Sequence, residues 1–474
     1  MELWEMGIRA AQDGLAKGEF TATDLVKAIA ARRAAEDGRI GAYLTFDEEG
    51  ALRLAAENPK SVPIAVKDLI NVKGQPCTCG SKILKGYVSP YDATVIANMK
   101  RNGFIPCGRV NMDEFAMGSS TENSALGVTR NPYDTERVPG GSSGGSAAAV
   151  GGNLAIAALG TDTGGSIRQP ASFCNCYGLK PSYGRVSRYG VTAFASSLDQ
   201  VGPMTKSVED AAVLLGAIAG RDPMDGTTPD EPVPDYLKEI EGASLKGVRL
   251  GLPKEYFSVT GLDPEVKAVT DAAIDKCANA GAELVEVSLP HTDYAMSVYY
   301  IVAPAEASAN LARFDGVRYG HRSAEAKDVY SLYLKSRAEG FGPEVKRRII
   351  MGTYVLSSGY YDAYYGRAQK VRTLIKRDFD EVFGKVDALL TPCAPTPAFK
   401  LGELQDPITM YLNDLFTIPS SLAGVCAASV PAGFTASAHL PVGVQFICGG
   451  FEETRLLRIS KAFEDLTGGG NGGL

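Results

Sequence analysis

Two serines in glycine-rich loops and one lysine in an apolar run are the residues of this 474-residue chain whose types could do chemistry together. Ser142 lies in the string GGSSGG, Ser166 closes the string TDTGGS, and Lys67 ends the run PIAVK. A serine hydroxyl is a weak nucleophile near neutral pH and needs a nearby base to take its proton. We therefore interpret the three residues as an acyl-transfer site.

Lysine, rather than histidine, is the candidate base in this sequence. The chain has three histidines, His291, His321 and His439, and none lies near either glycine loop in sequence. Lysine can act as a base when burial lowers its pKa and leaves part of the amine neutral. The apolar neighbours of Lys67 favour such burial. A lysine at a sheet edge that reaches for water is the ordinary alternative.

The glycines before Ser166 also predict an oxyanion pocket. Gly164 and Gly165 leave successive backbone N–H groups free of bulky side chains. Such groups stabilise the negative charge that develops on a carbonyl oxygen during acyl transfer. Ordinary turns do not require two clusters of glycine and serine so close together in sequence, so we favour the chemical interpretation.

Longer strings around these residues resemble the amidase signature family. The resemblance is carried by GGSSGGSAAAV at residues 140–150 and GTDTGGSIRQPASFC at residues 160–174, with PIAVKD at residues 63–68 before them. It implies an α/β fold, in which helices cover both faces of a large mixed sheet in a single large domain. We expect this domain to span residues 61–467, after a helical segment over residues 1–60 and before a disordered tail at residues 468–474.

The family resemblance also assigns roles within a Ser-cisSer-Lys triad. Ser166 would be the nucleophile, Ser142 the proton relay that follows a cis peptide bond, and Lys67 the ultimate base. The oxyanion donors would be the backbone N–H groups of Thr163, Gly164, Gly165 and Ser166.

Four further strings resemble one branch of this family, the glutaminase subunits of tRNA-dependent amidotransferases. They lie at residues 113–134, 183–210, 309–320 and 357–375. The resemblance implies hydrolysis of glutamine, whose ammonia converts Glu-tRNA(Gln) to Gln-tRNA(Gln) or Asp-tRNA(Asn) to Asn-tRNA(Asn). It also implies a heterotrimer with a B subunit, which binds the tRNA and uses ATP and Mg²⁺, and a C subunit that clamps the other two. No cofactor or metal is expected in this chain.

Free glutamine must be held by its α-carboxylate and α-amino group, and an arginine with an acid is the natural pair. In the resembled branch the arginine lies in KRRIIMG and the acid in MYLND, which places them here at Arg348 and Asp414. Tyr299 is a further expected contact. The neighbouring Arg347 is interpreted as part of a solvated helix face.

Three other interpretations stay open at this point. The pattern G-x-S-x-G at residues 140–144 matches the nucleophile elbow of α/β-hydrolases, with Asp387 and His439 as partners of Ser142. The elbow should follow a strand, however, and residues 135–139 are a poor one. The glycine loops could instead form an anion-binding nest in a non-enzymatic scaffold. Lastly, the chain could be a stand-alone amidase for small aliphatic or aryl amides.

Composition agrees with a large enzyme that does not itself grip RNA. The chain is 45% hydrophobic and 22% charged, with a net charge of −7 and a pI near 5.3. No run of lysine and arginine suggests a tRNA-binding face. No apolar run approaches the roughly 20 residues of a membrane span. Acids near the N-terminus, where a secretory leader would carry bases, favour the cytoplasm.

The nine cysteines are scattered, which favours free thiols in a reducing compartment. Two C-x-C pairs, at residues 77–79 and 174–176, together supply the four thiolates that a zinc site needs. Their spacing is shorter than zinc sites normally use, so we do not expect a metal.

Short apolar runs alternate with helical patterns over most of the chain, which is typical of α/β proteins. Strands are predicted at residues 61–66, 104–110, 154–159 and 248–252, and helices at 92–102 and 263–282. A helix start is predicted at Thr21, and residues 221–234 are predicted to be a surface loop.

Overall fold

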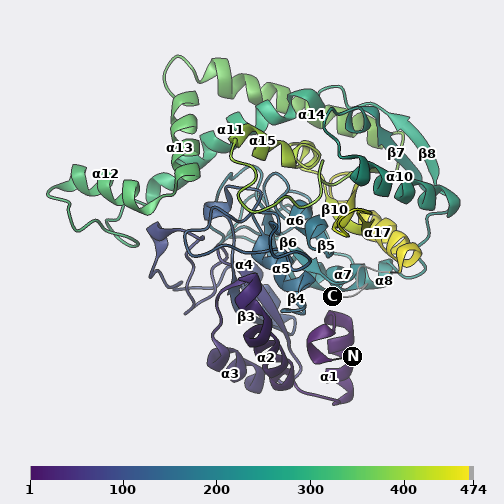
Figure 1. Ribbon diagram of the computed structural model, residues 1–474, viewed down its shortest axis with the longest axis horizontal. Coiled ribbons are helices and arrows are strands. Elements are labelled where there is room, and N and C mark those ends of the chain that lie inside the picture. Colours follow the sequence, from purple (N-terminus) through teal and green to yellow (C-terminus); the bar gives the residue numbers. More distant parts are fainter. Residues whose placement is uncertain (1, 469–474) are drawn as a thin grey trace.

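Eleven strands form one mixed sheet in the computed structural model, which describes residues 2–468 (Figure 1). The strands lie in the order β1-β3-β2-β4-β6-β5-β10-β11-β9-β7-β8. β2 is parallel to β3 and β4, and β7 is parallel to β8 and β9, whereas the other neighbours are antiparallel. The strands are β1 (Tyr43–Thr45), β2 (Val62–Lys67), β3 (Phe104–Val110), β4 (Ala157–Asp162), β5 (Tyr177–Lys180), β6 (Gln200–Thr205), β7 (Arg249–Pro253), β8 (Glu283–Val287), β9 (Ala388–Pro392), β10 (Ala427–Phe434) and β11 (Pro441–Ile447).

The four apolar runs that predicted strands correspond to β2, β3, β4 and β7, so the predicted α/β architecture is confirmed. β4 begins three residues later than its apolar run. Leu154 and Ala155 instead close the preceding helix, because their N–H groups donate to the Ala149 carbonyl at 2.7 and 3.0 Å. Satisfying the carbonyls at the end of a helix takes precedence there over extending the strand.

Helices cover both faces of the sheet, because successive residues of its central strands point to opposite sides. In β2, Val66 packs into the large core with α4, α7 and α17, while Ala65 packs into a second core with α5 and α6. In β4, Leu159 and Ala158 divide in the same way. The strands are buried on both sides, which explains why they read as continuous apolar runs and not as alternating ones.

In Figure 1, α11, α13, α14 and α15 lie along the top of the molecule, α1, α2 and α3 lie at its lower end near β3, and α12 extends from the body as an arm. Within residues 2–468, no helix combines the length and apolarity that a bilayer span needs. The helices are α1 (Ile8–Lys17), α2 (Ala22–Ile40), α3 (Glu48–Glu57), α4 (Thr94–Arg101), α5 (Gly144–Gly151), α6 (Arg168–Phe173), α7 (Val208–Ile218), α8 (Tyr236–Glu239), α9 (Lys254–Phe257), α10 (Pro264–Asn279), α11 (Ala295–Asn310), α12 (Val329–Gly340), α13 (Pro343–Val355), α14 (Arg367–Phe383), α15 (Pro407–Tyr411), α16 (Ile418–Ala423) and α17 (Glu453–Thr467).

The N-terminal segment is helical apart from one short strand. The predicted helix start at Thr21 is confirmed: its hydroxyl accepts from the Asp24 N–H, and the Asp24 carboxylate accepts from the Thr21 N–H at 2.8 Å. This reciprocal capping satisfies two donors at the start of α2. The sequence did not predict β1, which pairs with β3 at one edge of the sheet.

The surface loop predicted at residues 221–234 is confirmed, since no helix or strand is assigned there. The tail predicted to be disordered lies outside the described residues, except for Gly468.

The parallel strands β2, β3 and β4 end at one edge of the sheet, and that edge collects the polar residues of the two signature strings. Lys67 is the last residue of β2, and Asp162 is the last residue of β4. The chain after β3 returns to the same edge, where the Gly145 N–H at the start of α5 donates to the Asn111 carbonyl at 3.1 Å. In open α/β sheets, sites form at the carboxyl ends of the strands.

The approach of α5 to this edge leads to a stability prediction with an internal control. A Cβ atom at Gly145 would lie 2.4 Å from the backbone N and O of Asn111, whereas one at Gly216 in α7 would have only an ordinary contact at 3.9 Å. Gly145→Ala should therefore destabilise the protein by about 1–3 kcal/mol through overpacking. Gly216→Ala should stabilise it by about 0.5–1 kcal/mol, because alanine favours the helix. Melting temperatures of the two variants should move in opposite directions; equal shifts would contradict the close approach.

Candidate active site

The Lys67 amine is fully buried at the end of β2, among hydroxyl and carbonyl groups. Its Nζ donates to the hydroxyls of Ser142 and Ser143, each at 2.8 Å, and to the Thr161 hydroxyl at 2.9 Å. The Thr161 carbonyl is a fourth neighbour at 3.4 Å. All four groups are uncharged, and burial lowers the pKa of Lys67 to about 7. The predicted burial is confirmed, and the sheet-edge alternative is wrong.

The loop that carries Ser142 is fixed by hydrogen bonds on two sides. Its Gly141–Ser142 peptide bond is cis, as the family resemblance implies. The Gly141 N–H donates to Gln169 Oε1 at 3.0 Å, and the Asp113 N–H donates to the Ser142 carbonyl at 3.2 Å. The Asp113 carboxylate accepts from the Thr121 N–H at 2.9 Å, and burial raises its pKa to about 6. Sequence reasoning missed both Asp113 and Gln169.

Ser166 lies in the turn between β4 and α6, with 8% of its surface exposed. Its carbonyl accepts from the Ser143 N–H at 3.1 Å, which joins this turn to the Ser142 loop. Earlier in the turn, the Thr163 hydroxyl donates to Asp199 at 2.7 Å. Among the described residues, the Ser166 hydroxyl has no hydrogen-bond partner. The structure therefore bonds Lys67 directly to Ser142 and places Ser166 beside them through the backbone.

The backbone N–H groups of residues 163–166 are free donors within the part of the chain that the structure describes. Packing explains why this turn contains two glycines. Gly165 has a φ of +150°, and a Cβ atom there would lie 2.1 Å from the Thr417 hydroxyl. A Cβ atom at Gly164 would lie 2.8 Å from the Tyr299 ring and its hydroxyl. Free donors in a buried turn are the arrangement that oxyanion stabilisation requires.

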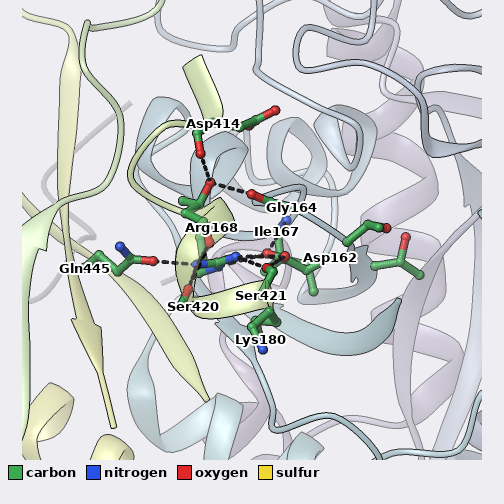
Figure 2. A network of polar contacts seen from close by, with 12 residues as sticks. Asp162, Gly164, Ile167, Arg168, Lys180, Asp414, Ser420, Ser421 and Gln445 are labelled. Atoms are coloured by element: carbon green, nitrogen blue, oxygen red, sulfur yellow. Dashed lines mark hydrogen bonds and ion pairs between the residues drawn. The ribbon is translucent and has the colours of Figure 1, made fainter. Parts of the chain in front are cut away.

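A fully buried ion pair supports the turn from below (Figure 2). Arg168 donates from Nε to one oxygen of Asp162 at 3.0 Å and from Nη2 to the other at 2.9 Å. Burial is the largest influence on Asp162 and alone would raise its pKa, but the charge and hydrogen bonds of Arg168, together with Lys180 and the Ile167 N–H, hold that pKa below its ordinary value. The remaining Arg168 donors bond to Thr417, Ser420, Ser421 and Gln445. Asp162 and Arg168 are six residues apart in the chain, but their ion pair was not predicted from the sequence.

Arg348 and Arg347 occupy opposite environments on α13. The Arg347 side chain is 46% exposed, as predicted, whereas that of Arg348 is 4% exposed. Arg348 Nε donates to Glu344 at 2.8 Å. Its guanidinium carbon lies 5.2–5.6 Å from three ring centroids, and a cavity of about 240 Å³ opens beside it. The three rings belong to Phe194, Tyr300 and Tyr411.

Asp414 is buried, with one oxygen bonded and the other free. Oδ2 accepts from the Ser119 hydroxyl at 2.5 Å, whereas Oδ1 has no hydrogen-bond partner among the described residues. A Cβ atom at Gly165 would lie 3.1 Å from Oδ1, so the free oxygen faces the oxyanion turn. Burial raises the pKa of Asp414 to about 7. A buried acceptor without a donor is costly, which suits a group that receives a ligand.

The α/β-hydrolase interpretation fails on the positions of its partners. His439 is exposed and stacks on Phe434, with ring centroids 4.4 Å apart. Asp387 forms an ion pair with Arg249 at 2.7 Å. Residues 135–139 contain no strand that could lead into a nucleophile elbow. Neither residue reaches the Ser142 loop, so this alternative is wrong.

The nine cysteines are free and buried. Within the described residues, no group of three or more histidine, cysteine, aspartate or glutamate side chains is arranged to hold a metal ion.

The sequence pattern of the amidase family matches residues 24–457 of this chain, which include every residue of the site described above. The chain belongs to the amidase family. The family resemblance seen in the sequence is therefore confirmed, together with the fold that it implied.

Relatives within the family are similar over nearly the whole chain. The chain is 56% identical to the A subunit of glutamyl-tRNA(Gln) amidotransferase from Geobacter sulfurreducens over 479 residues, which covers 98% of each chain. The crystal structure of the corresponding A subunit of glutamyl-tRNA(Gln) amidotransferase from Thermotoga maritima has a TM-score of 0.83 and 43% identity, covering 98% of this chain and 95% of that one. The peptide amidase from Stenotrophomonas maltophilia has a TM-score of 0.79 and 29% identity, covering 96% of each chain.

Breaking the buried pair beneath the oxyanion turn should destabilise the protein strongly. Arg168→Met leaves Asp162 charged, buried and unpaired, which typically costs about 3–5 kcal/mol. Arg249→Met removes the partner of Asp387 in a pair that is open to solvent, so its effect should be small. Denaturant unfolding of the two variants tests the difference. If Arg168→Met unfolds at the wild-type midpoint, the pair does not support the turn.

Proposed function

We propose that this chain is the glutaminase subunit of a tRNA-dependent amidotransferase and that it hydrolyses glutamine through Lys67, Ser142 and Ser166. The observation that carries the proposal is the buried Lys67 amine, whose Nζ lies 2.8 Å from the Ser142 hydroxyl and whose pKa is lowered by burial to about 7. A neutral amine in this position is a base that can act through a hydroxyl relay. A scaffold without catalysis would have no use for it.

The proposed reaction begins when neutral Lys67 takes the proton of Ser142 as Ser142 takes that of Ser166. Ser166 Oγ then attacks the side-chain amide carbon of glutamine. The N–H groups of residues 163–166 hold the oxyanion, and the relay returns the proton to the leaving nitrogen, so that ammonia departs. Water attacks the resulting ester by the same relay and releases glutamate. General-base assistance of this kind contributes about 10²–10⁴-fold to the rate.

We further propose that Arg348 binds the α-carboxylate of glutamine and that Asp414 binds its α-amino group. Arg348 is supported by its burial beside a cavity, and Asp414 by its free oxygen over the oxyanion turn. A cationic amine next to Asp414 would favour the charged form of this carboxyl. Tyr299, whose ring lies against Gly164, would close the site on the side of the scissile amide. The catalytic domain would span residues 61–467, with residues 1–60 as its N-terminal segment.

We also propose that the chain works in a heterotrimer with a B and a C subunit. The heterotrimer is supported by relatives of this chain that are named as A subunits of glutamyl-tRNA(Gln) amidotransferases. The tRNA, ATP and Mg²⁺ would be bound mainly by the B subunit, in keeping with the net charge of −7 and pI near 5.3 of this chain. The nine free thiols suit the reducing cytoplasm.

Glutamine turnover should depend on pH through Lys67. Below about pH 7 the amine is protonated and cannot accept a proton, so kcat should rise with pH and level off above this value. Measuring kcat at saturating glutamine keeps the titration of Asp414 from entering through binding. Lys67→Arg keeps a cation but removes the base and should lower kcat about 10²–10⁴-fold in a folded protein. A flat profile from pH 6 to pH 8, or an active Lys67→Arg variant, would refute the triad.

The heterotrimer predicts a specific set of copurifying proteins. A tagged chain expressed in its natural cell should carry two further subunits in equal amounts, and the assembly should amidate Glu-tRNA(Gln) or Asp-tRNA(Asn) when glutamine and ATP are added. Supplying ammonium chloride should bypass Lys67→Arg in this assay, because the partner does the tRNA chemistry. A chain that purifies alone and hydrolyses simple amides better than glutamine would instead be a stand-alone amidase.

A further inference from the structure

Two consecutive buried carboxylates, Asp113 and Glu114, contact two different parts of the site. Asp113 faces the serine loop: a Cβ atom at Gly141 would lie 2.1 Å from its Oδ2. Glu114 instead contacts Gly342, the residue that precedes α13. The triad described above does not use Glu114, although only 2% of its surface is exposed. An ionisable group that deep needs specific partners to be tolerated.

Glu114 has two such partners. Its Oε2 accepts from the Gly342 N–H at 2.8 Å, and its Oε1 accepts from the Ser81 hydroxyl. Gly342 is the N-cap of α13, so Glu114 satisfies a free donor at the positive end of that helix. A Cβ atom at Gly342 would lie 2.3 Å from Glu114 Oε2, which shows how closely the carboxylate approaches the backbone.

The helix that begins at this contact carries the proposed carboxylate-binding arginine. Arg348 lies within α13 and is oriented by Glu344, which also accepts from the Tyr411 hydroxyl at 2.7 Å. Beyond Arg348, α13 packs tightly on α11, since a Cβ atom at Gly352 would lie 1.9 Å from the Pro304 carbonyl. Arg348 therefore lies between two fixed points of a rigid helix, and Glu114 provides the first of them.

The helix that precedes α13 in the chain is α12, the arm that extends from the body in Figure 1. Glu114 contacts the link between these two helices. Two residues of α12, Val329 and Tyr330, are 78% and 75% exposed, so the far end of the arm has little packing to hold it. Near the link to α13, Phe115 contacts Phe341 at a centroid distance of 5.6 Å. The contacts of residues 114 and 115 thus attach the link between α12 and α13 to the body.

We propose that Glu114 is a positioning residue for substrate binding, which sets the start of α13 so that Arg348 meets the α-carboxylate of glutamine. This inference rests on the proposed function of Arg348. Because Asp113 is its neighbour in the chain, the same backbone segment holds both the serine loop and the substrate arginine. The distance between the nucleophile and the bound carboxylate is then fixed by one short stretch of chain.

The test is the kinetics of Glu114→Ala with two substrates. Removing the acceptor frees the start of α13, so KM for glutamine should rise while kcat changes little. The expected rise is about tenfold, which corresponds to the free energy of one hydrogen bond to a charged group. The second substrate is 4-aminobutyramide, which is glutamine without its α-carboxylate. Its hydrolysis should be unchanged, because it has nothing to offer Arg348.

A matched control is available at the start of another helix. Glu464 is also a buried carboxylate, and it accepts from the Val208 N–H at the start of α7 at 2.9 Å. Burial raises the pKa of both Glu114 and Glu464 to about 7. Glu464→Ala should lower the melting temperature in a similar way and leave KM for glutamine unchanged. An equal rise in KM in this variant would mean that Glu114 acts only through general stability.

Arg348→Ala separates failure of this inference from failure of the proposed function. In the Arg348→Ala background, Glu114→Ala should have no further effect on KM, because both changes remove one interaction. If Arg348→Ala leaves KM unchanged, the proposed substrate contact is wrong. If Arg348→Ala raises KM and Glu114→Ala does not, the positioning role of Glu114 is wrong, and additive effects would overturn it as well.

The conservative change Glu114→Gln keeps the test valid if Glu114→Ala does not fold. Its side-chain carbonyl can still accept from the Gly342 N–H, while its amide group faces Ser81. We expect KM for glutamine between those of the wild type and Glu114→Ala, with 4-aminobutyramide hydrolysis unchanged. A loss of kcat for both substrates in the folded Gln variant would place the effect in the serine loop and overturn the proposal.

Discussion

Burial of one amine among uncharged oxygens is the constraint on which the site depends. Lys67 has no exposed surface, and its neighbours are three hydroxyls and a carbonyl. A carboxylate in direct contact would hold the amine in its charged form, whereas hydroxyls leave both forms accessible. The carboxylates near the site bond to other groups and not to the amine, as Asp162 does with Arg168. The sheet thus keeps water away from the amine and places no carboxylate in contact with it, so the amine can still lose and accept a proton.

Close backbone approach is the second requirement, and the glycines supply it. Side chains at Gly141, Gly145, Gly164 and Gly165 would each meet a neighbouring atom within 3 Å. These neighbours include Asp113, Tyr299 and Thr417, so the glycines let distant loops and helices converge on one point. The arrangement costs conformational freedom, which tight packing of both cores must offset.

The sequence predicted the α/β class and the meeting of Lys67 with the Ser142 loop, because apolar runs and signature strings are local features, but it did not predict most strands of the sheet. Apolar runs predicted β2, β3, β4 and β7, and the glycine strings predicted the cis bond before Ser142 through family resemblance. Residues such as Ser143, Thr161 and Asp113 escaped prediction, because a string does not say which side chains converge in space. β1 escaped because three residues are too few for a periodic pattern.

The positions of the site residues along the chain have a consequence for how this architecture diversifies. Lys67, Ser142 and Ser166 come from the first three parallel strands and the segments after them, whereas Arg348 and Asp414 come from the helical layer built by the second half of the chain. In the mechanism that we propose, bond cleavage and recognition of the rest of the substrate are therefore encoded in separate stretches of the chain. In the proposed scheme, substitutions in the later stretch can change which amide is recognised while the residues proposed for cleavage stay the same. The peptide amidase shows that this overall fold is shared at 29% identity.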